Sequence, residues 1–420
     1  MTHPTASRAR FGVLSLLFVT VVINYMDRAN LSVAAPALAR DLHLTPAELG
    51  WAFSAFGWTY AALQIPGGWL VDVVRPRLLY AVILMSWSFT TVLQSLAGGF
   101  GTLFGLRAAT GVFEAPAFPI NNRVVTRWFP VGERASAIAA YTSGQYVGLA
   151  FLYPVMTFAQ QAYGWRPLFV LTGVAGLLWG GIWYALYRDP PNQPGEGVTS
   201  ATGQGRQAPT WQDLAAVCRH RKLWGVYVGQ FAVASTLWFF LTWFPTYVEQ
   251  YRGFDVRSTA GLRSLPFLAA LCGILCSGLL SDGLARRGVP AGTARKLPVL
   301  IGLALTTTIV GANYVTSPFA VTVFLSIAFF GNGMASITWV FVSLLAPPRL
   351  LGLTGGVFNF FGNLSSIVVP VVIGYLVADG DFAPALIFIA ALAVVGVGAF
   401  VFLVGSIPSG GLEYERGRSN

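Results

Sequence analysis

Charged side chains are scarce in this sequence: they make up 10% of its 420 residues, whereas soluble domains carry about 25%. Apolar residues account for 55% of the chain. Because one transmembrane helix needs about 20 apolar residues, this content suffices for roughly a dozen bilayer spans. The composition excludes a soluble globular protein, a disordered chain and a coiled coil, and it indicates a multi-pass membrane protein.

Cysteine and histidine are also rare, with three residues of each. Three cysteines cannot form the disulfide framework of a small secreted domain. Cys272 and Cys276 stand one helical turn apart in an apolar stretch without a nearby histidine, which favours packing over metal binding. The three histidines, His3, His43 and His220, all lie outside the apolar runs. We therefore expect neither a metal site nor a cofactor.

Motifs of catalysis and of nucleic-acid binding are missing as well. The sequence offers no Ser/His/Asp set and no phosphate-binding loop, and it leaves no room for an additional soluble domain. We therefore expect neither an enzyme nor a receptor. The net charge is +10, but the basic residues are scattered over short loops rather than gathered on one face, which argues against a nucleic-acid partner.

Apolar runs follow one another along the chain and predict twelve transmembrane helices in an all-α membrane protein. They cover approximately 12–38, 47–73, 78–97, 100–127, 135–158, 166–188, 223–249, 257–284, 297–315, 318–346, 351–378 and 383–406. A β-barrel would show alternating segments of about ten residues instead. The first run has some features of a signal peptide, but Asp27 and Arg28 interrupt it, so we expect a retained helix.

A polar stretch rich in proline, glycine, serine and threonine separates the first six runs from the last six. The predicted organisation is therefore an N-terminal six-helix bundle (1–188), a cytoplasmic linker (189–222) and a C-terminal six-helix bundle (223–420). We expect the protein to act as a monomer in the lipid bilayer.

The loop charges predict the orientation, because Lys and Arg concentrate in cytoplasmic loops. When the loops are numbered alternately from an internal N-terminus, one side of the membrane holds eighteen of the 26 basic residues. These are Arg8, Arg10, Arg75, Arg77, Arg127, Arg134, Arg188, Arg206, Arg219, Arg221, Lys222, Arg286, Arg287, Arg295, Lys296, Arg349, Arg416 and Arg418. Both termini are therefore predicted to face the cytoplasm.

The two halves share a sequence repeat. Gly68 and Asp72 stand before a pair of arginines, and Gly278 and Asp282 stand before another pair at a separation of 210 residues. We expect the glycines to permit close packing and the aspartates to pair with basic loop residues. Two six-helix halves in parallel orientation form the architecture of the major facilitator superfamily. The repeat resembles that superfamily's loop signature, although Val73 replaces a basic residue in the first copy.

Four ionisable residues stand inside the predicted spans: Asp27 and Arg28 in the first, Arg107 and Glu114 in the fourth. Ionisable residues are costly in hydrocarbon and mark functional sites. Arg107 and Glu114 are seven residues apart and so share one helix face. The alternative is a static ion network that fastens the helices. Because apolar residues fasten helices as well or better, we favour the functional interpretation.

These four groups suit different tasks. A carboxylate that gains and loses an arginine partner as helices move can load and release a proton near neutral pH. Asp27 and Glu114 are the only carboxylates deep in the spans, and we predict that they couple transport to protons while Arg107 tunes one of them. Arginine stays charged and its planar fork matches a carboxylate. Arg28 is therefore our candidate contact for an organic anion.

The motifs around these residues resemble the anion:cation symporter family of the major facilitator superfamily. The first span contains the segment Asn24-Tyr25-Met26-Asp27-Arg28-Ala29-Asn30-Leu31-Ser32. Further matches are Arg107-Ala108-Ala109-Thr110-Gly111, Glu114-Ala115-Pro116, Trp128-Phe129-Pro130, Glu133-Arg134, Gly164-Trp165-Arg166, Trp243-Phe244-Pro245-Thr246-Tyr247 and Asn359. The family includes bacterial hexonate, hexuronate and glucarate transporters, so the resemblance implies the inner membrane of a bacterium.

The resemblance also implies a binding site for a sugar acid between the two halves. Its residues would be Tyr25, Arg28, Tyr60, Gln145, Ser336, Thr338, Trp339 and Asn359. Amides and hydroxyls suit a polyol, which both donates and accepts hydrogen bonds. Alternative roles remain open: the tyrosines can serve packing, Gln145 and Asn359 can bridge helices, and Thr338 can bond its own backbone.

The resulting hypothesis is a proton-coupled symporter that imports an organic anion by alternating access. A proton-driven exporter of drugs or metabolites is the first alternative. Such exporters usually carry a Gly-Pro-x-x-Gly-Gly-like stretch in their fifth helix, and residues 141–148 lack it. The second alternative is an importer of aromatic carboxylates such as phthalate. Hexonate, hexuronate and glucarate all remain open as substrates, as does sodium in place of protons.

Overall fold

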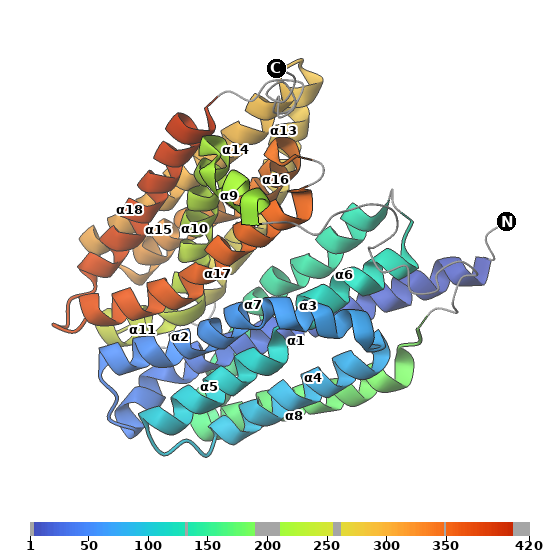
Figure 1. Cartoon of the computed structure of the whole chain (residues 1–420). Coiled ribbons are helices and arrows are strands. Elements are labelled where there is room, and N and C mark those ends of the chain that lie inside the picture. The colour runs from blue at the N-terminus through green and yellow to red at the C-terminus, as the bar shows by residue number, and fades with distance from the viewer. Residues whose placement is uncertain (1–3, 131–132, 190–210, 255–261, 348–349, 406–420) are drawn as a thin grey trace. The chain divides into compact units, whose positions relative to one another are not determined.

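The computed structural model describes residues 4–130, 133–189, 211–254, 262–347 and 350–405. Within these ranges all regular secondary structure is helical (Figure 1). The all-α prediction is confirmed. Residues 190–210 of the predicted linker lie outside the described residues.

Each apolar run of the first half corresponds to one helix or to two consecutive helices. They are α1 (Pro4–Asp41), α2 (Pro46–Ala62) with α3 (Gln64–Val73), α4 (Pro76–Gln94), α5 (Phe100–Glu114) with α6 (Ala117–Trp128), α7 (Arg134–Tyr163) and α8 (Trp165–Leu186). The break between α5 and α6 coincides with Pro116, which has no N–H to continue the helix. Glu114 therefore lies at a helix end inside its span.

The second half follows the same pattern with more interruptions. Its elements are α10 (Arg221–Thr242), α11 (Phe244–Thr246), η2 (Tyr247–Tyr251), η3 (Leu262–Ser264), α13 (Leu265–Arg286), α14 (Ala291–Thr306), η4 (Thr307–Tyr314), α15 (Pro318–Ala335), η5 (Ser336–Thr338), α16 (Trp339–Leu345), α17 (Leu351–Leu376), α18 (Ala383–Gly398) and η7 (Ala399–Val404). A short helix, α9 (Trp211–Arg219), lies inside the predicted linker, where hydropathy predicts none.

Nine helices of the described part are long and apolar enough to cross a membrane. The other three predicted spans are α2 with α3, α5 with α6, and α7. The first two are divided into shorter helices, so neither piece reaches the required length of 18 residues.

Contacts divide the chain into two compact units, which are described separately. Unit 1 comprises Met1–Gly203, Leu241–Ser264 and Pro370–Ala378, and unit 2 comprises Gln204–Phe240, Leu265–Val369 and Asp379–Asn420. Unit 1 thus contains the six predicted spans of the first half together with two short pieces of the second half.

Helix pairing is repeated in the two units. In unit 1, α2 packs on α5 and α4 packs on α8; in unit 2, the corresponding spans pair as α13 on α15 and as α14 and η4 on α18. Glycine permits the close approach in both units: a Cβ on Gly111 would meet the carbonyl oxygen of Phe56, and a Cβ on Gly273 would meet that of Phe330. These equivalent pairings support an internal duplication.

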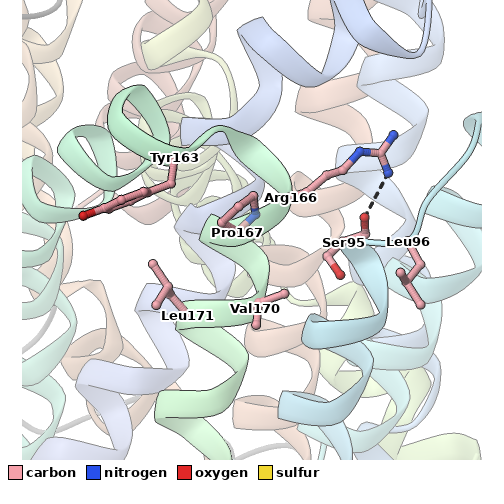
Figure 2. Close-up of a pocket in the computed structure, with 7 residues that line it drawn as sticks. All are labelled: Ser95, Leu96, Tyr163, Arg166, Pro167, Val170 and Leu171. Carbon is pink, nitrogen blue, oxygen red and sulfur yellow. Dashed lines mark hydrogen bonds between the residues drawn. The ribbon is translucent and has the colours of Figure 1, made fainter.

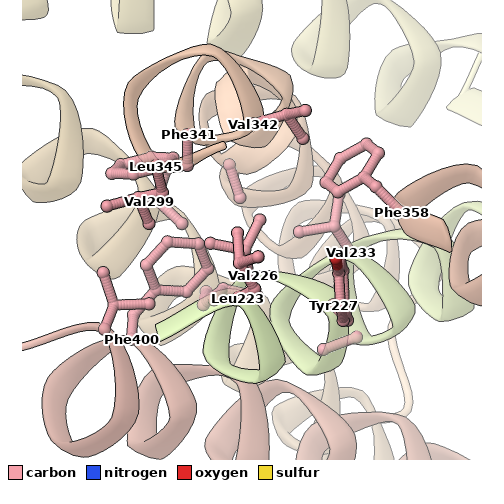
Figure 3. Packing of buried hydrophobic residues seen from close by; sticks show 14 of the residues in the cluster. Leu223, Val226, Tyr227, Val233, Val299, Phe341, Val342, Leu345, Phe358 and Phe400 are labelled. Carbon is pink, nitrogen blue, oxygen red and sulfur yellow. The ribbon is translucent and has the colours of Figure 1, made fainter. Parts of the chain in front are cut away.

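An aromatic and aliphatic core holds the helices of unit 2 together (Figure 3). Val226 of α10, Phe341 of α16 and Phe400 of η7 are fully buried in it. The rings of Phe341 and Phe400 meet edge to face with centroids 5.1 Å apart. This packing fixes α16 and, with it, the preceding η5 turn that carries Thr338.

The loop motif behaves differently from its expectation. Among the described residues of its own unit, a Cβ on Gly68 or on Gly278 would meet no neighbouring atom within 4 Å, so the predicted close packing at these glycines is not seen within either unit. Asp282 is exposed on α13, and none of the ion pairs in the described ranges involves it. Arg286 instead donates to the backbone carbonyl of Asp282. The side chain of Asp72 is outside the described part of the structure.

Candidate functional site

Arg28 and Glu114 form a buried ion pair in unit 1. Nε and Nη2 of Arg28 lie 2.6 and 2.5 Å from Oε1 of Glu114. Arg28 is 8% exposed and Glu114 is fully buried. Both nitrogens approach the same oxygen, and the buried Oε2 has no hydrogen-bond partner within the described ranges. The pair therefore uses only half of the carboxylate.

Three aromatic rings surround the guanidinium of Arg28. Its central carbon lies 5.0 Å from the ring centroids of Tyr25, Phe56 and Tyr60. The rings of Phe56 and Tyr60 are stacked with centroids 5.1 Å apart. Aromatic faces attract a cation, most strongly where water is excluded. Tyr25 and Tyr60 thus hold the arginine in place, and Phe56, which the motifs did not single out, does the same.

Asp27 faces a different neighbour, because successive residues of a helix point about 100° apart. Trp87 of α4 donates its indole N–H to Oδ2 of Asp27 at 3.0 Å, and both side chains are fully buried. Arg107 is 2% exposed, and its Nη1 donates to the backbone carbonyl of Asp27 at 3.3 Å rather than to the carboxylate. Arg107 therefore connects α5 to the backbone of α1 at Asp27, and among the described residues it forms no ion pair within 4 Å.

Gln145 lies half-buried on α7. Gly144 and Gly148, which lie one helical turn apart on either side of Gln145, face α1: a Cβ on either would meet Phe18 or Val22. This close approach brings the middle of α7 against the helix that carries Asp27 and Arg28. Gln145 is thus part of the same unit as the ion pair.

The remaining predicted contacts lie in unit 2. Thr338 is 1% exposed and donates to Oε1 of Gln230 at 2.7 Å, so the alternative in which it bonds its own backbone is wrong. The hydroxyl of Ser336 donates to the carbonyl of Gly333. Trp339 is 47% exposed and packs edge to face on Phe358.

Asn359 is exposed on α17, and Gln230 of α10 lies across from that helix. A Cβ on Gly362 would come within 3.0 Å of the Gln230 amide nitrogen. Gln230 therefore accepts a hydrogen bond from η5 and packs against α17 at Gly362. As a lone amide in an apolar run, Gln230 was detectable from the sequence, but no motif marked it.

A surface groove of about 700 Å³ lies elsewhere in unit 1 (Figure 2). It is lined by Ser95, Leu96, Tyr163, Arg166, Pro167, Val170 and Leu171. The guanidinium of Arg166 already binds the carbonyls of Ser95 and Ala97 and the carboxylate of Asp41. The groove thus offers an apolar surface without a free charge and does not suit an organic anion.

Within the described residues, no three His, Cys, Asp or Glu side chains gather in a way that could hold a metal ion. The ionisable residues of the site are instead arranged as two acids and two arginines. All four of these side chains are buried in unit 1.

The sequence matches the profile described as Major Facilitator Superfamily over residues 17–370. The chain therefore belongs to this superfamily of membrane transporters, as its repeat and its motifs predicted. Its fold is also similar to that of a solved bacterial homolog of the human lysosomal transporter Spinster, with a TM-score of 0.70, 21% sequence identity and 96% of each chain covered.

Two relatives from bacteria are more similar in sequence. A D-galactonate transporter of Escherichia coli O6:H1 is 48% identical over 95% of this chain and 96% of its own length. A probable galactarate/D-glucarate transporter, GudP of Bacillus subtilis, is 38% identical over 95% of this chain and 92% of its own length. Both relatives are named for sugar acids, the substrate class that the motifs implied.

Proposed function

We propose that this chain is a proton-coupled symporter that imports a sugar acid, with D-galactonate as the first candidate. The substrate class rests on the two relatives, which are named for D-galactonate and for galactarate and D-glucarate. The observation that carries the mechanism is the buried pair in which Arg28 binds a single oxygen of Glu114. This pair gives Arg28 an internal carboxylate that a substrate carboxylate can replace.

The proposed cycle begins with protonation of Glu114. A protonated carboxyl no longer balances the arginine, so Arg28 becomes free to bind the carboxylate of the substrate through its planar fork. The aromatic rings of Tyr25, Phe56 and Tyr60 keep the guanidinium in place during this exchange. When the proton leaves, Glu114 regains its charge, competes for Arg28 and expels the anion.

Asp27 is the second proposed proton site. Its carboxylate is fully buried and binds Trp87, a neutral donor, instead of an arginine. A buried charge without an opposite partner is costly, so a proton is readily taken up there. When both acids are protonated, the charges that remain at the site are those of the two arginines and the substrate anion. This lower charge favours the conformational change of alternating access.

The hydroxyl groups of the substrate are assigned to the polar residues of the site. In unit 1, Gln145 offers both a donor and acceptors. In unit 2, we assign the same role to Ser336, Thr338, Asn359 and, in addition, Gln230. Trp339 is exposed within its unit, and its ring suits stacking on the C–H face of a sugar acid.

We further propose that the protein works as a monomer in a bacterial inner membrane with both termini in the cytoplasm. The orientation rests on the excess of Lys and Arg in alternate loops. Cysteine labelling of an exposed loop position in intact cells tests it. Reaction of Arg286→Cys with a membrane-impermeant reagent before lysis would contradict the proposed orientation.

Uptake into proteoliposomes tests the function. Purified protein should concentrate D-galactonate when the external buffer is more acidic than the lumen, and Asp27→Asn should abolish this accumulation. A panel with galactarate, D-glucarate, glucuronate and phthalate establishes the substrate. Accumulation driven by a sodium gradient without a pH gradient would overturn the proton coupling, and accumulation of phthalate alone would overturn the substrate class.

A further inference from the structure

The two oxygens of the Asp27 carboxylate differ in their hydrogen bonding. Trp87 donates to Oδ2 at 3.0 Å, whereas the buried Oδ1 has no hydrogen-bond partner within the described ranges. We propose that Trp87 is a positioning residue for proton transfer: it fixes Asp27 toward α4, stabilises the charged carboxylate and leaves Oδ1 as the atom that takes the proton. This inference rests on the proposed function, in which Asp27 carries a transported proton.

Trp87 is anchored at its backbone and packed at its ring. Its backbone carbonyl accepts hydrogen bonds from the hydroxyls of Thr90 and Thr91, at 2.7 and 3.0 Å. Its ring meets that of Tyr80 edge to face with centroids 6.4 Å apart. Because the side chain is also fully buried, its indole N–H is held beside Asp27 by packing, as a positioning group requires.

The α8 side of the carboxylate is closed by a glycine. A Cβ on Gly176 would lie 3.7 Å from Oδ2 of Asp27 and would clash with the side chain of Ser88. The absence of a side chain at this position lets α8 pack closely on Ser88 of α4, next to the Asp27 carboxylate and its partner Trp87. The sequence of α8 thus contributes to the same arrangement without supplying a polar contact.

The charged groups near Asp27 come from α1 and α5. Arg28 on α1 is paired with Glu114 of α5. Arg107 of α5 binds the backbone carbonyl of Asp27 and not its carboxylate. The charge of Asp27 therefore has no ion-pair partner within 4 Å in the described ranges.

The helices on the other side, α4 and α8, supply no charge at this depth. Their charged residues are Arg77 and Arg166. Arg77 donates to the carbonyl of Tyr184, and Arg166 binds Asp41. Among the described residues, the indole N–H of Trp87 is therefore the hydrogen-bond donor that stabilises the charged carboxylate of Asp27 directly.

Removing this N–H has a defined effect on pH dependence. A hydrogen bond to a charged group favours the charged form, so without it Asp27 keeps its proton to a higher pH. We expect the external pH at half-maximal uptake to rise by about one unit, which is a tenfold gain in proton affinity. A residue that only fills space would change the rate at every pH and leave the midpoint in place.

The experiment compares Trp87→Phe with Trp183→Phe. Trp183 is a matched control because it is also fully buried and also meets Tyr80 edge to face, but its indole N–H has no hydrogen-bond partner among the described residues. Uptake of D-galactonate is measured over a series of external pH values with the lumen held at one pH. The expected result is a raised midpoint for Trp87→Phe and the wild-type midpoint for Trp183→Phe.

A midpoint that is equal in Trp87→Phe, Trp183→Phe and the wild type would overturn the inference, and so would an equal rise in both variants. If Trp87→Phe does not fold, a benzothienyl analogue of tryptophan at position 87 removes the N–H and keeps the bicyclic shape. The test separates this inference from the proposed function. Uphill uptake by Asp27→Asn contradicts the proposed function, whereas an inactive Asp27→Asn with an unmoved Trp87→Phe midpoint contradicts the role of Trp87 alone.

Discussion

At the scale of single residues, the two acids of the site differ in what they contact. Glu114 is bound by Arg28 through one oxygen, and Asp27 is bound by the neutral indole of Trp87. A charged partner and a neutral partner respond differently when the acid is protonated. In the proposed cycle, protonation of Glu114 would release an arginine, whereas protonation of Asp27 would remove an unbalanced charge.

The variant Glu114→Gln is expected to bind substrate but to lose uphill transport. The amide keeps the shape of the side chain and never competes for Arg28 as an anion. Exchange of labelled for unlabelled D-galactonate across the membrane needs no net proton movement, so it should continue. Accumulation driven by a pH gradient should fall to the background of empty liposomes. If Glu114→Gln still concentrates substrate, this acid does not couple transport to protons.

The variant Arg28→Ala is expected to lose affinity for carboxylates. Removal of a charge-assisted pair costs about 2 to 5 kcal/mol where one charge stays buried, so the Kd for D-galactonate should rise at least about thirtyfold. Isothermal titration measures this change. Arg77→Ala is a suitable control, because Arg77 is a surface arginine that donates to the carbonyl of Tyr184. Equal affinity in Arg28→Ala and the wild type would exclude Arg28 as the anion contact.

At the scale of elements, hydropathy predicted where the helices are but not where they break. The break at Pro116 has a sequence signal, whereas the η5 turn at 336–338 follows an unbroken apolar run. Contacts between helices were harder still to predict. Trp87 and Gln230 carry no motif, and each gains its role from a residue more than 50 positions away, Asp27 and Thr338. The need of the buried charges for partners was predictable, but the pairing was not: Arg107 was expected beside an acid, whereas Arg28 is the arginine that pairs with Glu114.

Helix packing in unit 2 gives a stability prediction. Gly273 of α13 faces the backbone of α15, and a Cβ there would meet the carbonyl oxygen of Phe330. Gly273→Ala should therefore lower the unfolding temperature in detergent. Gly278→Ala on the same helix meets no neighbouring atom within 4 Å and should be neutral or stabilising by up to about 1 kcal/mol. Equal unfolding temperatures for the two variants would contradict the described packing of α13 on α15.

The hydrogen bond between Thr338 and Gln230 gives a prediction on selectivity. Thr338→Val keeps the shape of the side chain but frees the amide oxygen of Gln230. If Gln230 contacts a substrate hydroxyl, affinities for D-galactonate and for its 2-deoxy or 3-deoxy analogues should change by different factors, in the range of about tenfold. Competition against labelled D-galactonate measures these affinities. A uniform change for all analogues would indicate that the pair only fastens η5 to α10.

At the scale of the whole molecule, the proposed mechanism fixes the charge that moves with each substrate. A monoanion imported with two protons carries one net positive charge, whereas a dianion imported with two protons carries none. A membrane potential of 100 mV contributes about 2.3 kcal/mol per charge, which corresponds to about 50-fold more accumulation. An inside-negative potassium diffusion potential should therefore increase the accumulation of D-galactonate and leave that of galactarate nearly unchanged. If Asp27 and Glu114 are both protonated in each cycle, the two substrates must differ by one in the net charge that they carry across the membrane. Equal responses of the two substrates to the potential would therefore contradict two protonated acids.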